Sequence, residues 1–187
     1  GFRRSVKPEI LFPGGRQLYR TPVLDSQTVY QPDGGLAAPG QQVAWDSNQA
    51  GALSKTVHIR GTSNATALAT RSAARIYEML DALRGDREDS IPQGLISVLI
   101  KALLVHGAKQ DDDACEAIAA ALKTRDNSRQ FKEVMSRYLG YGAVQIERVL
   151  ACTEQRGTVL GCGEIRENEI HEYRLPLPPG LSSSQEW

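Results

Sequence analysis

The sequence lacks any excess of one charge. Its 187 residues carry 22 lysines and arginines against 22 aspartates and glutamates, so the formal net charge at pH 7 is zero. A protein that binds nucleic acid or an anionic membrane through its overall field needs a surplus of positive charge. We therefore expect no nucleic acid and no membrane among the partners, and any partner must be recognised by local chemistry.

Long apolar runs are absent as well. No stretch reaches the roughly 18 consecutive apolar residues of a membrane-spanning helix, and the first ten residues, GFRRSVKPEI, lack the apolar block of a signal peptide. We therefore expect a cytoplasmic protein, or one whose targeting segment is not part of this sequence. Since 41% of the residues are hydrophobic, we expect a globular chain with a sizeable core, in one domain or slightly more.

Paired cysteines are also missing. Cys115, Cys152 and Cys162 are an odd number and lack the C-x-x-C spacing of a zinc site, so we predict free, buried thiols rather than a disulfide framework. The three aspartates at 111–113 lack the alternating ligands and the glycine of an EF-hand calcium loop, so we interpret them as the start of a helix. We expect no metal and no organic cofactor.

The pattern along the chain changes twice. Residues 1–60 contain short extended runs, EILF, QLYR, QTVY and TVHIR, separated by glycine, proline and aspartate. Residues 31–54 read as a long loop, either a functional insertion or a mobile segment. Apolar residues spaced three, four or seven apart then predict a helix over 62–83.

Further helices and a second extended region follow. An almost wholly apolar segment predicts a deeply buried helix between Ser90 and Gly107. Asp113 with Glu116 indicates a capping pair for the next helix, and an amphipathic pattern predicts another over 131–139. After Ala151 the runs TVLGCGEI and IHEYRLPLP flank the polar RENE, which predicts two strands around a turn.

The triplet Gly61-Thr62-Ser63 stands where a strand-like run gives way to the predicted helix. A serine hydroxyl is a poor nucleophile unless a base takes its proton and fixed donors receive the charge that develops on the substrate. The unpaired N–H groups of a first helical turn are such donors, and Gly61 permits the bend that leads into them. The triplet alone is also consistent with a simple N-cap by Thr62 or Ser63.

The run GTSNAT resembles the nucleophile motif of the subtilisin-like serine proteases (subtilases), in which Gly-Thr-Ser precedes a helix of small residues. Three other stretches resemble further parts of that family in the same order: VKPEILFPGG upstream of the serine, LISVLIKALLVHGA for the next buried helix, and GYGAVQIERVL for a late turn and short helix. The resemblance spans roughly residues 6–150. It implies an α/β fold with parallel strands and packed helices over 1–151, followed by a small β extension over 152–187.

The chain departs from the family pattern on both sides of the serine. Asn64, Ala67 and Leu68 stand where the family usually has methionine, proline and histidine. Upstream, no position matches the family's aspartate, histidine or oxyanion asparagine. His58 lies on an apparent strand five residues before Ser63, and we assign it a structural role. His106 and His171 resemble no catalytic base either.

The resemblance implies that Ser63 is a catalytic nucleophile and that Gly61, Thr62 and Asn64 support its turn and the oxyanion. The implied substrate is a polypeptide, and the histidine and aspartate would lie in an N-terminal half of the catalytic domain that is missing here. We therefore expect the isolated chain to be inactive and to self-associate through surface left uncovered. The alternative is a non-catalytic subtilase-like scaffold or protein-binding module.

Overall fold

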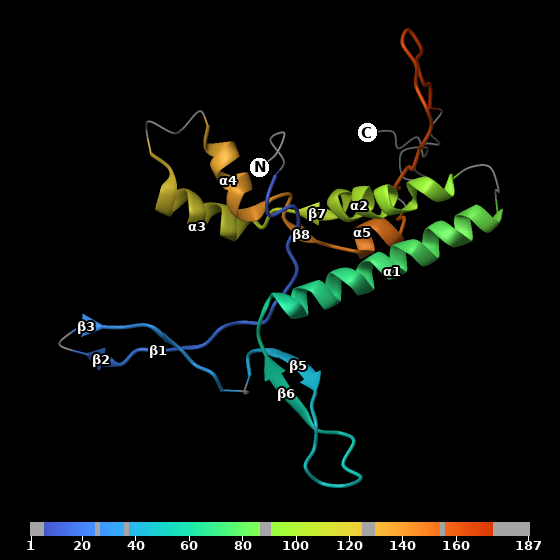
Figure 1. The fold of residues 1–187 in the computed structure, drawn as a ribbon. Helices are drawn as coiled ribbons and strands as arrows, with labels where there is room; N and C mark the ends of the chain where they lie inside the picture. The colour runs from blue at the N-terminus through green and yellow to red at the C-terminus, as the bar shows by residue number, and fades with distance from the viewer. Residues whose placement is uncertain are drawn as a thin grey trace, which may run out of the picture. The chain divides into compact units, whose positions relative to one another are not determined.

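The computed structural model describes residues 6–24, 27–35, 38–86, 91–124, 130–153 and 156–173. The chain divides into two compact units: unit 1 combines Gly1–Leu11 with Ser72–Trp187, and unit 2 is Phe12–Arg71. The long helix α1 (Thr62–Asp86) contributes its first residues to unit 2 and the rest to unit 1 (Figure 1). Helices and short strands occur together along the chain, which confirms the predicted α/β class.

Unit 2 opens with an extended segment that leads into a two-stranded arm. Its strands are β1 (Tyr19–Arg20), β2 (Val23–Leu24), β3 (Gln27–Thr28) and β4 (Gln31–Pro32). The first strand pairs antiparallel with the fourth, and the second with the third, in one common register. The two ladders therefore follow one another along the same pair of chain segments (Figure 1). We call residues 17–24 and 27–33 the β arm.

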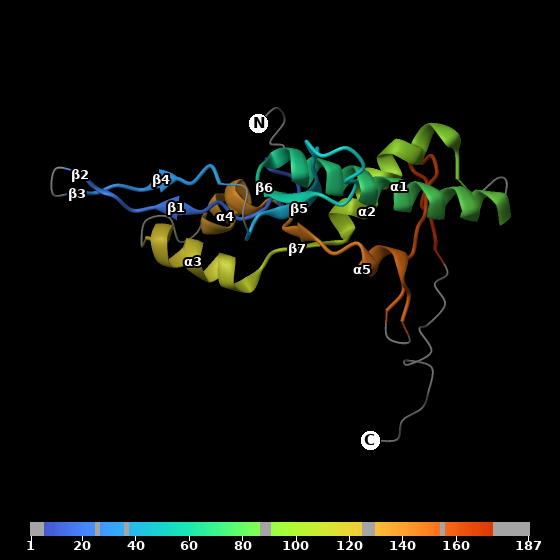
Figure 2. The same ribbon diagram turned by 90° about the horizontal axis from the view of Figure 1, so that it is seen from below.

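A second hairpin in unit 2 leads directly to α1. β5 (Gln41–Ala44) pairs antiparallel with β6 (Thr56–Ile59), with Gln41 opposite Ile59. Figure 2 shows the two strands side by side, with β6 continuing into the start of α1. The strand predicted for TVHIR is thus confirmed. The prediction of a loop over 31–54 was wrong in part, because this segment contains β4 and β5. The strand β5 was missed because its sequence, QQVA, lacks the alternating apolar pattern that indicates a strand.

The predicted first helix is confirmed, since α1 begins at Thr62 and continues to Asp86. In unit 1 the apolar spacing of α1 places its buried side chains on one face of the helix. Ile76 and Leu80 lie four residues apart on one face and are both fully buried. Packing of this face adds to a helix propensity that the many alanines, leucines and arginines of α1 already favour.

The rest of unit 1 is a group of helices with two short strands. These elements are η2 (Gln93–Leu95), α2 (Ile96–His106), β7 (Ala108–Lys109), α3 (Asp112–Leu122), α4 (Phe131–Leu139), β8 (Ala143–Val144) and α5 (Glu147–Leu150). α2 packs against α5, and α3 against α4 (Figure 1). β7 pairs antiparallel with β8. The parallel pairing seen in the described residues is a single bridge between Leu11 and Ala143.

Two details of the predicted helices were wrong. α2 is not buried all round: Leu99 and Leu103 are buried, but Val98 is 61% exposed. The cap of α3 is Asp111 rather than Asp113, because the Asp111 carboxylate accepts the Ala114 N–H at 2.9 Å. The interpretation of the aspartate triplet as a solvated helix start is confirmed.

The C-terminal region has the predicted turn without the predicted strands. The turn lies at Glu167 and Asn168, where Asn168 has a φ of 66°. The described residues on either side of it, 158–166 and 169–173, form no strand, and the end of IHEYRLPLP lies outside the described residues. The boundary of a separate extension at residue 152 stays a prediction.

The three cysteines form no disulfide, as predicted, but they are not buried: Cys152 is exposed, and Cys115 and Cys162 are partly exposed. Among the described helices, none combines the length and the apolar character that crossing a membrane requires.

Candidate functional site

Ser63 lies where the sequence predicts it, in the first turn of a helix. It is the second residue of α1 and its side chain is exposed. The chain reaches it from the end of β6 through Gly61, which has a φ of +146°. Side chains disfavour this backbone conformation, so glycine at this position allows β6 to lead directly into the helix. We call residues 59–64 the Ser63 turn.

Asn64 holds the Ser63 turn in place. It is 6% exposed, and its side-chain amide donates to the Gly14 carbonyl at 3.3 Å and to the Ile59 carbonyl at 3.2 Å. The Gly61 N–H donates to the same Gly14 carbonyl at 2.8 Å. One amide group thus ties the end of β6, the Ser63 turn and the segment around Gly14 together. Because both bonds are donated to main-chain carbonyls, the Asn64 amide holds the backbone of the turn.

The N–H groups of Thr62 and Ser63 are the donors that the helix start leaves available. Within the described residues no acceptor bonds to either group. The first turn of α1 carries no acidic residue, so no carboxylate offsets the positive end of the helix dipole there. A negative charge that develops on a group bonded to Ser63 would therefore meet unpaired backbone donors.

Among the described residues, no base is hydrogen-bonded to Ser63. In the part of the chain that the structure describes, no hydrogen bond joins the Ser63 hydroxyl to a histidine or a carboxylate. His58 lies in β6 opposite Gln42, and His106 is the last residue of α2. His171 lies 2.8 Å from the Glu164 carbonyl and 3.4 Å from the Tyr173 hydroxyl. The three histidines thus lie in three separate segments: β6, the end of α2 and the C-terminal region.

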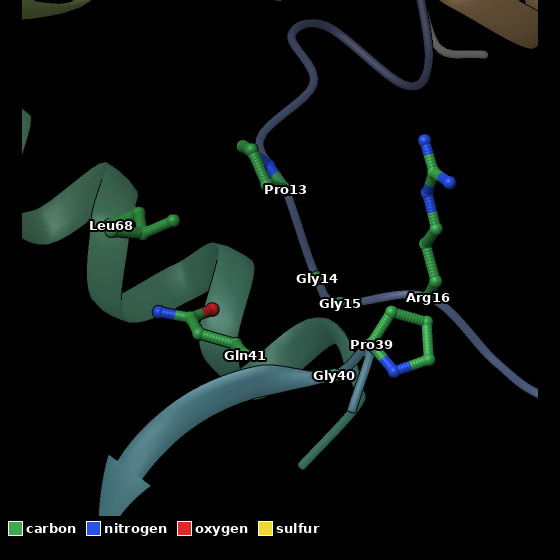
Figure 3. A pocket seen from close by; sticks show the side chains of 8 residues that line it. All are labelled: Pro13, Gly14, Gly15, Arg16, Pro39, Gly40, Gln41 and Leu68. Carbon is green, nitrogen blue, oxygen red and sulfur yellow. The ribbon is translucent and has the colours of Figure 1, made fainter. Parts of the chain in front are cut away.

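One pocket is lined in part by the Ser63 turn, and a second pocket shares Gly14 and Gly15 with it. The first, of about 420 Å³, is lined by Phe12, Gly14, Gly15, Gln17, Arg60, Gly61, Thr62 and Ala65. The second, of about 580 Å³, lies between the segment Pro13 to Arg16, the start of β5 and α1. In Figure 3 the side chains of Pro13 and Leu68 point into this second pocket from opposite sides. Leu68 therefore gives the second pocket an apolar wall.

Arg60 connects the Ser63 turn to the base of the β arm. Its guanidinium donates to the Arg16 carbonyl at 2.7 Å and to the Gly35 carbonyl. Beside it, the Asp33 carboxylate accepts the Gly35 N–H at 2.9 Å and forms an ion pair with Arg20 at 3.2 Å. These two contacts, the Gly35 bond first, lower the pKa of Asp33 below its usual value, so this carboxylate is ionised at neutral pH.

The described residues contain no cluster of three or more histidine, cysteine, aspartate or glutamate side chains that could hold a metal ion. The Ser63 turn itself presents an exposed hydroxyl and backbone N–H groups.

Comparison with protein-family models matches residues 2–142 to the subtilase family. The match covers more than half of the chain and includes the whole Ser63 turn, and the chain therefore belongs to the subtilase family, whose members are serine peptidases. The resemblance seen in the sequence is confirmed over this range. Comparisons with curated proteins and with solved structures gave no match.

Sequence reasoning missed Gly14 and Arg60. The Pro-Gly-Gly run at 13–15 indicates a turn, but it does not show that the Gly14 carbonyl accepts two hydrogen bonds from the Ser63 turn. Arg60 directly precedes the triplet and carries no motif. Its role depends on carbonyls that lie 25 and 44 residues away along the chain.

Proposed function

We propose that Ser63 is the nucleophile of a serine endopeptidase whose histidine and aspartate lie outside these 187 residues. The observation that carries the proposal is the placement of Ser63. Its hydroxyl is exposed in the first turn of α1, in a turn held by Asn64 and Gly14, beside backbone N–H groups without an acceptor among the described residues. Membership of the subtilase family supports a peptide bond as the substrate.

In this mechanism the Ser63 side-chain oxygen bonds to the carbonyl carbon of a peptide. A histidine takes the hydroxyl proton at the same time. The negative charge that forms on the carbonyl oxygen is stabilised by the Ser63 N–H and by donors from elsewhere in the domain. The histidine then protonates the leaving amine, and water releases the acyl group from Ser63 by the same route. Gly61, Thr62 and Asn64 keep the turn in the conformation that presents the hydroxyl.

We further propose that the isolated chain is inactive. A serine without a base is a weak nucleophile, and no histidine is bonded to Ser63 in the described part of the chain. Residues of a catalytic triad act as a unit, so the loss of two of them removes most of the catalysis.

The test compares the isolated chain, the intact protein, and the intact protein carrying Ser63→Ala. Each is incubated with a fluorophosphonate probe and with β-casein, an unstructured protein substrate, and its folding is checked by circular dichroism. We expect labelling and cleavage in the unmodified intact protein alone, and a loss of at least about 10⁴-fold in kcat for Ser63→Ala. The matched control is Thr66→Ala, which removes another hydroxyl from the same end of α1 and keeps activity.

Two outcomes contradict the proposal. Cleavage by the isolated chain at the rate of the intact protein would place a base within these residues. A folded intact protein that is neither labelled nor active would instead favour the non-catalytic scaffold, an alternative supported by the replacement of the family's methionine, proline and histidine at Asn64, Ala67 and Leu68.

A further inference from the structure

The two faces of the β arm differ in chemistry. Residues directly opposite each other in an antiparallel pair share one face, and alternate residues along a strand share it too. Tyr19 lies opposite Pro32, and Val23 lies opposite Thr28. In the same register Tyr30 falls on this face, diagonal to Tyr19. The other face carries Arg20 and Asp33, which form an ion pair.

The side chains on the face with the tyrosines are exposed. Tyr19, Val23 and Tyr30 are 56%, 69% and 72% exposed. We call Tyr19, Thr21, Val23, Thr28, Tyr30 and Pro32 the aromatic face. None of its members is charged. Exposed apolar side chains gathered on one face are typical of interaction surfaces, and tyrosine is enriched at such surfaces because it combines a large ring with a hydroxyl that can form hydrogen bonds.

Both outer edges of the arm are also unpaired in the described residues, since its segments form two-stranded ladders. Backbone N–H and C=O groups on such an edge can pair with another extended chain. A two-stranded ribbon is marginally stable by itself. Here the base is reinforced by the Arg20 ion pair with Asp33 and by Gln17, whose side chain donates to the Asp33 carbonyl at 3.0 Å.

The base of the arm continues to the Ser63 turn. A pocket of about 250 Å³ is lined by Gln17, Asp33, Gly34, Gly35, Ile59 and Arg60. It shares Gln17 and Arg60 with the pocket of about 420 Å³ that Gly61 and Thr62 line. The two pockets therefore adjoin, and Arg60 holds both ends of the arm's base through the Arg16 and Gly35 carbonyls. A chain bound along the arm would lead to the candidate nucleophile.

We propose that the β arm is a docking surface for an extended, unfolded polypeptide segment, and that it holds a substrate chain several residues away from the bond that Ser63 attacks. The identity of the bound chain as substrate rests on the proposed function. Three observations favour this occupant: the uncharged aromatic face, the unpaired backbone edges, and the pockets that continue to the Ser63 turn. Peptide groups are common to all unfolded chains, so such a surface needs little sequence preference.

The length of the arm sets the length of substrate that benefits from it. Residues 17–24 span about 26 Å at a rise of about 3.3 Å per residue. A peptide of four residues spans at most about 14 Å, so it covers about half of the arm or less, whereas an unstructured protein extends along all of it.

The first experiment measures binding of fluorescein-labelled β-casein to the 187-residue chain by fluorescence anisotropy. The variant combines Tyr19→Ser with Tyr30→Ser. The matched control combines Gln27→Ser with Gln31→Ser, which changes two exposed residues on the opposite face of the same strands. We expect the tyrosine variant to raise Kd at least about tenfold and the glutamine control to change it less than about twofold. Because all four side chains are exposed, circular dichroism should show unchanged folding.

The second experiment separates this proposal from the proposed function. In the intact protein the tyrosine variant should raise KM for β-casein and leave kcat unchanged, with no effect on a four-residue peptide or on labelling of Ser63 by fluorophosphonate. Ser63→Ala should leave casein binding intact. If Ser63→Ala keeps full activity, the proposed function fails while the binding result stands.

Casein binding that is absent, or that is equal in the tyrosine variant and the glutamine control, overturns the docking proposal. Sedimentation provides the other decisive result. If the tyrosine substitutions abolish self-association of the chain but not its casein binding, the aromatic face binds a second copy of this protein instead.

Discussion

The hydrogen bonds of Asn64 hold the turn that presents the neighbouring Ser63. A side-chain amide has two hydrogens to donate, and here one group reaches the carbonyls of both Gly14 and Ile59. Methionine, which subtilases usually have at this position, has no hydrogen to donate. The replacement is therefore a different way of fixing the Ser63 turn, and not simply a loss. Buried hydrogen bonds of this kind are costly to break because the abandoned partners stay without water.

The residue-scale prediction concerns the Gly61 amide. Asn64→Ala should destabilise the Ser63 turn by about 1–3 kcal/mol, because the Gly14 and Ile59 carbonyls each lose one hydrogen bond and Gly14 keeps the one from the Gly61 N–H. Since the Gly61 N–H bonds to Gly14 in the same turn, its hydrogen exchange measured by NMR should accelerate about tenfold or more. Thr66→Ala is the control, because the Thr66 hydroxyl is exposed and bonds within α1. Equal exchange in both variants would show that the Asn64 contacts do not hold the turn.

At the scale of elements, a short turn after α4 joins the first residues of unit 1 to the later ones. The Leu11 N–H donates to the Gly142 carbonyl at 2.9 Å, and the Val144 N–H donates to the Leu11 carbonyl at 3.2 Å. Gly142 has a φ of +104°, and a Cβ at this position would overlap the backbone carbonyl of Lys109 in β7. The turn thus requires glycine for its conformation and also for the close approach of β7.

Gly142→Ala should therefore destabilise unit 1 by roughly 3 kcal/mol or more, since a strained φ and a backbone overlap add together. The control is Gly157→Ala, where an added Cβ meets no atom within 4 Å. Urea unfolding followed by circular dichroism measures both. A Gly142→Ala variant with the stability of the control would contradict the assigned role of this turn.

At the scale of the whole molecule, the buried apolar side chains are unevenly distributed. Among the residues that the structure describes, the buried hydrophobic ones all belong to unit 1: Ile76, Leu80, Ile91, Ile96, Leu99, Leu103, Leu104, Phe131, Leu139 and Val149. Among the described residues of unit 2, Asn64 alone is buried. Burial of apolar surface is the main term that offsets the loss of conformational entropy on folding. The described part of unit 2 therefore has little buried apolar surface to stabilise it.

This distribution predicts unequal stability. In the isolated chain the amides of β5 and β6 should exchange with solvent at least about 100-fold faster than those of α2, because opening unit 2 exposes little apolar surface. In the intact protein, where we propose that the rest of the catalytic domain is present, the protection of β5 and β6 should rise. Hydrogen exchange followed by mass spectrometry compares the two. Equal protection of both units in the isolated chain would contradict this expectation. Self-association of the chain stays a prediction, which light scattering tests.

Features that depend on neighbours close along the chain could be predicted from the sequence alone. The start of α1, the place of Ser63 in its first turn and the positions of α3 and α4 all follow from spacings of three or four residues and from local caps. The GTSNAT run and the stretches around it were also enough to indicate the family that the comparison shows.

The contacts between groups that lie far apart along the chain could be seen only in the folded protein. Asn64 bonds to a carbonyl 50 residues away, Arg60 bonds to carbonyls 25 and 44 residues away, and β5 is a strand because β6 lies beside it. The exposed face of α2 could not be predicted from the sequence either, because an apolar residue is buried only where another part of the chain covers it. Helical periodicity is a property of one segment, whereas a buried hydrogen bond, a strand pair or a covered face belongs to two segments that the fold brings together.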